Sequence, residues 1–130
     1  MATLPASYAP NYDGAGMKVL VAAFFLCAHA VAHLVAPHST TLWFGRLDLG
    51  ESATRVLGLV WAGLAAAFVV GAVGLCLHAD WWRPIVVVTA LVSSILCVLT
   101  LPEAKWGIPA NLVVLGFSLS TLWLRLVALH

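Results

Sequence analysis

Four long apolar runs divide the chain, and short segments that carry charges or prolines separate them. Each run has roughly the 20 residues that a helix needs to cross about 30 Å of hydrocarbon. We expect helices because a membrane barrel shows short alternating strands instead of long apolar runs. The predicted spans cover residues 17–36, 53–77, 84–101 and 108–126. The pattern therefore predicts an all-α fold, an integral membrane four-helix up-down bundle with both termini on the same side.

The two membrane sides are defined by the predicted connections. Side A holds both termini and the 78–83 loop, and side B holds the 37–52 loop and the 102–107 turn. Lys and Arg are evenly divided between the two sides, so the positive-inside rule gives no orientation. Residues 1–16 are rich in Pro, Ala, Gly, Ser and Tyr. We expect them to form an extended tail ahead of a single domain, residues 17–130.

Composition agrees with a membrane protein and excludes several other classes. The chain is 63% hydrophobic and only 8% charged, which is too few charges for the surface of a soluble domain. The net charge of +1 gives no electrostatic basis for binding nucleic acid. The cysteines at positions 27, 76 and 97 form no Cys-x-x-Cys pair, so a thiol–disulfide relay lacks its motif.

His29 and His33 are ionisable residues inside the first apolar run. Such residues are costly at this depth, so they usually face a cavity, a partner or a ligand. Because positions i and i+4 share a helix face, both imidazoles can address one point. Two interpretations follow. The pair does acid–base chemistry, since His titrates near neutral pH, or each ring bonds a backbone carbonyl or Asn111 and locks helices together.

Further polar residues gather toward side B. His29 lies about 10 Å from the side-B end of its helix, and Asn111 lies just inside the fourth run. We therefore predict a pocket opening at side B, with His29, His33 and Asn111 as the catalytic candidates. The residues that we expect to bind the ligand are Glu103, Arg55, Ser93 and Trp61.

Each of these polar residues also has a plainer interpretation. Arg55 can snorkel or pair with Glu51, Ser93 can bond back to its own helix, and Glu103 can be a solvated turn residue. Metal binding is a weak prediction, because His29 and His33 lack the Glu of a His-Glu-x-x-His motif and need a further ligand. The candidates for that ligand are Glu103, His38 and Asn111.

No cofactor is predicted from the sequence. A bis-His haem is a poor fit, because His29 lies in the side-B half and His78 lies at the side-A edge. Small residues at positions 63, 67 and 71 recur every four residues. They allow close helix approach, which we expect within one chain rather than across a dimer.

Four segments resemble a group of small bacterial four-span membrane proteins. They are His-Ala-Val-Ala-His-Leu at 29–34, Ala-Thr-Arg-Val-Leu-Gly-Leu-Val-Trp-Ala at 53–62, Trp-Trp-Arg-Pro at 81–84 and Glu-Ala-Lys-Trp-Gly-Ile-Pro-Ala-Asn-Leu at 103–112. The resemblance covers most of residues 20–125 and implies a four-span fold in a bacterial inner membrane. It directs attention to His29, His33, Glu103, Lys105, Gly107 and Asn111 and implies no particular reaction.

A looser similarity exists to two other four-helix membrane families, the DoxX-like proteins and the sterol-isomerase-like group. The second implies His, Glu and Asn residues that move a double bond. This chain departs from that pattern, because none of its predicted spans contains Asp or Glu.

The leading hypothesis is an intramembrane polar pocket for an apolar small molecule such as a lipid, an isoprenoid or a quinone. If chemistry occurs there, we expect proton transfer in an isomerisation, cyclisation or hydration, with His29 as acid or base, His33 as its tuner and Asn111 as the polar anchor. The main alternative is a non-catalytic accessory subunit of a larger membrane complex. The partners expected beside the bilayer and the small molecule are other membrane subunits or further copies of the chain. A small transporter is the third hypothesis.

Overall fold

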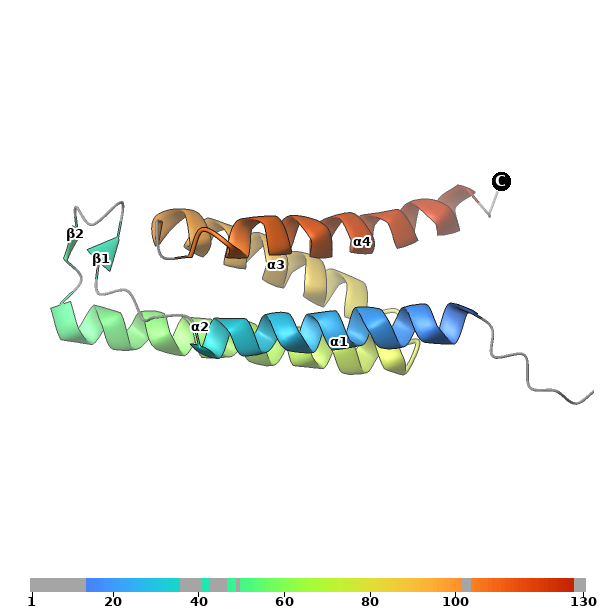
Figure 1. The fold of residues 1–130 in the computed structure, drawn as a ribbon, viewed down its shortest axis with the longest axis horizontal. Helices are drawn as coiled ribbons and strands as arrows, with labels where there is room; N and C mark the ends of the chain where they lie inside the picture. The colour runs from blue at the N-terminus through green and yellow to red at the C-terminus, as the bar shows by residue number, and fades with distance from the viewer. Residues whose placement is uncertain (1–13, 36–40, 43–46, 49, 102–103, 128–130) are drawn as a thin grey trace, which may run out of the picture.

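The computed structural model describes residues 14–35, 41–42, 47–48, 50–101 and 104–127. Four helices run up and down: α1 (Gly14–Val35), α2 (Gly50–Cys76), α3 (Trp82–Leu99) and α4 (Gly107–Val127). Figure 1 shows that α1 begins and α4 ends at the same end of the molecule, as the sequence predicts. A two-residue strand pair, β1 (Thr41–Leu42) and β2 (Leu47–Asp48), lies between α1 and α2 in the chain. It is a small departure from the purely helical prediction.

The helix bounds lie within three residues of those that the apolar runs predict. The largest differences are at the starts of α1 and α2, three residues each. α1 begins at Gly14 and so takes in the last residues of the predicted tail; residues 1–13 lie outside the described part. Pro84 and Pro109 each sit in the first turn of a helix. A backbone N–H in that turn has no partner within the helix, so proline is tolerated there.

Packing buries an apolar core and leaves many other large apolar residues on the outer surface. α2 packs against both α1 and α3, and α4 packs against α3, so Figure 1 shows two layers of two helices. The core includes Phe68, Val86 and Ala90, all fully buried. By contrast, Phe24 is 75% exposed and Leu59 is 73% exposed. An outward apolar surface of this extent suits contact with lipid.

Three helices are long and apolar enough to cross a membrane in the described part of the chain: Gly16–Val35, Gly50–Cys76 and Trp82–Leu99. α4 contributes a shorter apolar stretch, Gly107–Thr121, within a helix of 21 residues that is about 31 Å long. The protein is therefore an integral membrane protein built as an all-α four-helix bundle.

Two glycines of α2 bring α3 close. A Cβ at Gly71 would collide with the Val86 side chain, and one at Gly74 would lie 2.6 Å from the Trp81 ring. Gly63, in contrast, has open space where its Cβ would be. Of the small residues predicted to mediate packing, Gly71 makes a close contact within the chain and Gly63 does not.

The turn between α2 and α3 has a defined helix end. The N–H of His78 donates to the carbonyl of Leu75 at 3.1 Å, and that of Ala79 donates to Gly74 at 3.0 Å. These bonds form a Schellman motif, which requires a left-handed residue at its first position beyond the helix. His78 occupies that position with φ of 53°. The turn fixes α3 antiparallel to α2.

Candidate functional site

The paired histidines of α1 face the inside of the bundle. His29 is 7% exposed and His33 is 4% exposed, whereas their neighbours Ala28 and Leu34 are exposed. The two imidazole centroids lie 4.6 Å apart. The inward orientation predicted from the i, i+4 spacing is confirmed.

A chain of hydrogen bonds joins the two imidazoles through α4 and α3. His29 Nε2 lies 2.7 Å from Asn111 Oδ1, and Asn111 Nδ2 donates to Ser93 Oγ at 2.8 Å. Ser93 Oγ lies 3.1 Å from His33 Nε2. We call His29, Asn111, Ser93 and His33 the histidine network. It ties α1 to both α3 and α4.

The direction of the bonds in the histidine network follows from the groups that take part. A carbonyl oxygen only accepts, so His29 Nε2 carries the hydrogen and donates it to Asn111. Ser93 Oγ accepts from Asn111, and it donates to His33 Nε2 or accepts from it according to the tautomer of His33. His29 therefore carries a hydrogen on Nε2, whereas the ring nitrogen that carries the hydrogen in His33 is set by its tautomer.

Aromatic side chains of α2 enclose the histidine network. Phe68 is fully buried, with its ring centroid 4.9 Å from that of His29 and 5.5 Å from that of His33. Trp61 stacks on His33 with centroids 4.9 Å apart. Trp61 is among the predicted ligand-binding residues, and here it contacts an imidazole.

The side-chain polar groups of the histidine network find their hydrogen-bond partners within the network. Ser93 and Asn111 have no exposed surface, and no buried side-chain nitrogen or oxygen among the described residues lacks a hydrogen-bond partner. Asn111 Nδ2 also lies 3.9 Å from Cys97 Sγ. The sequence predicts a hollow at this place, and the structure fills it with packed side chains, because complementary donors and acceptors meet there.

Of the other polar residues, some lie apart from the network and some lie outside the described part of the chain. Arg55 pairs with Glu51 on the exposed face of α2, as the plainer interpretation has it. Glu103 and His38 lie outside the described residues. Ser94 donates to the Ala90 carbonyl at 2.7 Å, within its own helix. In the described ranges, no three His, Cys, Asp or Glu side chains gather as a group that could hold a metal.

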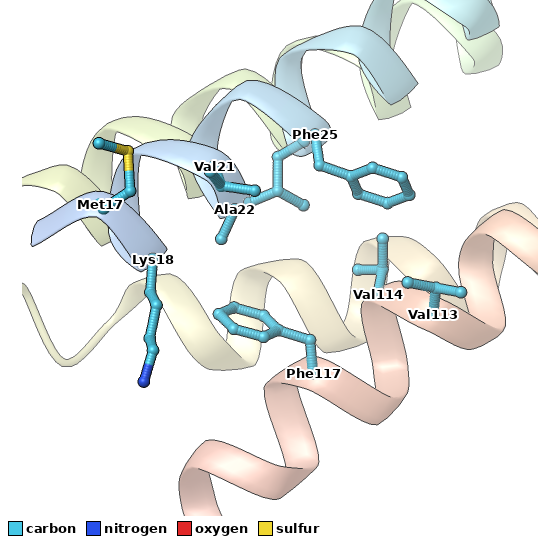
Figure 2. Close-up of a pocket in the computed structure, with 9 residues that line it drawn as sticks. Met17, Lys18, Val21, Ala22, Phe25, Val113, Val114 and Phe117 are labelled. Atoms are coloured by element: carbon cyan, nitrogen blue, oxygen red, sulfur yellow. The ribbon is translucent and has the colours of Figure 1, made fainter. Parts of the chain in front are cut away.

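A cavity of about 470 Å³ lies between α1 and α4. Figure 2 shows side chains from both helices facing it, with Phe25 and Phe117 among them. Every lining residue is apolar except Lys18. The nine lining residues are Met17, Lys18, Val21, Ala22, Phe25, Leu26, Val113, Val114 and Phe117.

The cavity occupies the half of the bundle nearer side A, whereas the sequence predicts a pocket at side B. It extends along α1 from Met17 to Leu26, nine positions or about 13.5 Å. His29 follows Leu26 by one helical turn, and Asn111 precedes Val114 by one turn. The hydrogen bond between His29 and Asn111 therefore joins α1 to α4 just beyond the inner end of the cavity.

Phe68 and the cavity are absent from the predictions made from the sequence, and they differ in how far the sequence signals them. Phe68 could be found, because it lies seven positions after Trp61 and so shares its face of α2. The cavity gives no comparable signal, because it depends on the distance that packing leaves between α1 and α4.

Comparisons with protein-family models, with curated proteins and with solved structures each find no match to this chain.

Proposed function

We propose that this protein binds an apolar, chain-like molecule from the bilayer in the cavity between α1 and α4. The observation that carries the proposal is a cavity of about 470 Å³ with an almost wholly apolar lining. Ligand sites for small molecules commonly span about 300–1,000 Å³ and are mostly apolar. A lipid or isoprenoid chain is the class of ligand that fits such a lining.

Access to the cavity is lateral in this proposal. Met17, Val21 and Val113 line the cavity and are also exposed on the outer surface, at 66%, 59% and 59%. That surface faces lipid in an integral membrane protein. A ligand can therefore pass from the bilayer between α1 and α4 without crossing water.

The histidine network supports the cavity by fixing α1 against α3 and α4. Lipid chains are as apolar as the helix faces, so burial of apolar surface contributes little to helix association in a membrane. Interhelical hydrogen bonds such as that of His29 with Asn111 then hold helices together. This role is the helix-locking interpretation of the pair, and it keeps the inner end of the cavity closed.

Proton transfer by His29 is the second candidate function. Two observations favour it: the ring of Phe25, a lining residue, is stacked parallel to that of His29 at 6.4 Å, and Nδ1 of His29 carries a lone pair that the network does not use. A ligand that displaced Phe25 would meet this base. Incubation with geranylgeranial in heavy water tests it: deuterium replaces a proton on the carbon γ to the aldehyde, which the conjugated carbonyl makes acidic, with the native protein and not with His29→Gln.

Native mass spectrometry in detergent tests the binding function, with hexadecanol as the probe. Val113→Trp places a large ring in the cavity, and Leu112→Trp is the matched control because Leu112 is 61% exposed and is not a lining residue. We expect the bound fraction of hexadecanol to fall in Val113→Trp and to persist in Leu112→Trp. Equal binding by both variants, or a chain that purifies only within a larger complex and binds no probe, overturns the proposal.

A further inference from the structure

Lys18 is the one charged residue among those that line the cavity. It lies near the start of α1, at side A, next to Met17. Figure 2 shows Met17 and Lys18 at one end of the lining and Phe25 at the other. The cavity therefore has a cationic end at the membrane surface and an apolar end near the middle of the bundle.

No carboxylate among the described residues pairs with the Lys18 ammonium. The two described ion pairs join Arg55 to Glu51 and Arg83 to Asp80. The Lys18 side chain is exposed, as is usual for a lysine whose ammonium reaches the interface. Among the described residues, no carboxylate therefore competes with an anionic ligand for the Lys18 ammonium at the mouth of the cavity.

The dimensions of the cavity match one chain in one leaflet. The lining extends about 13.5 Å along α1 and about 6 Å along α4, from Val113 to Phe117, and the α1 part is close to half of the roughly 30 Å hydrocarbon thickness. At about 30 Å³ for each water-sized group, a volume of about 470 Å³ holds roughly fifteen such groups. A space of this volume accommodates one acyl chain.

From these observations we infer that the ligand is a long-chain fatty acid, with its carboxylate at Lys18 and its chain extending between α1 and α4 to the inner end of the cavity. This inference rests on the proposed binding function and adds the ligand class and its orientation. The chain would lie parallel to the lipids of the side-A leaflet. Its methyl end would approach Leu26 and Val114, one turn from the His29–Asn111 bond.

The test compares hexadecanoate with hexadecanol in the same detergent at pH 8, using native mass spectrometry. We expect the native chain to prefer hexadecanoate about fivefold, the upper end for an exposed ion pair. Lys18→Gln should remove that preference while hexadecanol still binds, and Lys18→Arg should restore it. Lys105→Gln is the matched control, because Lys105 is exposed near side B and lies over the Trp106 ring instead.

The outcomes separate this inference from the function on which it rests. Binding of neither probe overturns both. Equal binding of the two probes by the native chain, or an unchanged preference in Lys18→Gln, overturns the fatty-acid assignment alone. A third probe, dipalmitoylphosphatidylglycerol, tests whether the ligand has one acyl chain or two. If it displaces hexadecanoate at equal concentration, the assignment of a ligand with a single acyl chain is wrong.

Discussion

His29 on α1 and Asn111 on α4 are 82 positions apart in the chain and are joined by a hydrogen bond of 2.7 Å. The bond lies one turn beyond a cavity that separates the same two helices nearer side A. One polar contact thus links the packing of the bundle to the shape of its candidate binding site.

Replacing Asn111 with Leu should lower the free energy of unfolding by about 2 kcal/mol. The substitution removes the partner of His29 and the donor to Ser93, and buried polar groups left without partners cost about 1–3 kcal/mol. Thermal unfolding in detergent measures the change. Ser120→Ala is the control on the same helix, because the Ser120 hydroxyl is exposed and bonds its own backbone. An equal effect of both substitutions would contradict a tie between α1 and α4.

Substitution by alanine should affect the stability of the bundle differently at Gly63 and at Gly71, two glycines of α2. Gly71→Ala should destabilise the bundle by about 1–3 kcal/mol, because the new methyl group meets the Val86 side chain. Gly63→Ala has open space and should be neutral or slightly stabilising, since Ala favours helix. Unfolding of the two variants in detergent compares them. If Gly63→Ala proved the more harmful, Gly63 would face a partner, as a dimer requires.

His78→Gly should stabilise the protein by about 0.5 kcal/mol. A non-glycine residue in the left-handed region costs roughly 1–2 kcal/mol, and glycine relieves that strain at an entropic penalty of about 0.5–1 kcal/mol. The midpoint of thermal unfolding should therefore rise. Leu77→Gly serves as the control, because φ is positive at His78 and not at Leu77, and it should lower the midpoint.

Arg55→Gln should leave both stability and probe binding unchanged. Arg55 pairs with Glu51 one turn away, and both side chains are largely exposed, at 77% and 80%. Exposed ion pairs of this kind contribute little. Hexadecanol binding and thermal unfolding, measured on the same preparation, check the result. A loss of binding would return Arg55 to the list of ligand-binding residues.

The helices were predictable because their signal is local. Each apolar run is long enough to cross the bilayer, and prolines and charges mark its ends. The inward direction of His29 and His33 was predictable for a similar reason, since an exposed imidazole in lipid is costly. The part that Asn111 plays also follows, because the up-down topology brings the start of α4 to the depth of His29.

The cavity and the closure of the histidine network were not predictable in the same way. Both depend on small differences in distance between helices that are far apart in the chain. Ser93 illustrates this, because a serine in a helix often bonds its own backbone, as Ser94 does. Ser93 instead lies where Asn111 and His33 both reach it. The position of Ser93 in the interface between helices therefore determines that its hydroxyl bonds other side chains and not its own backbone.

The most direct test of chain binding between α1 and α4 is photo-crosslinking of the native protein in liposomes. The probe is hexadecanoate with a diazirine at its middle carbon, and mass spectrometry of peptides locates the adducts. We expect adducts concentrated on the cavity residues, above all Val21, Phe25, Val113 and Phe117. Adducts spread evenly over outward residues such as Leu59 and Val88, without enrichment in the cavity, would contradict the account.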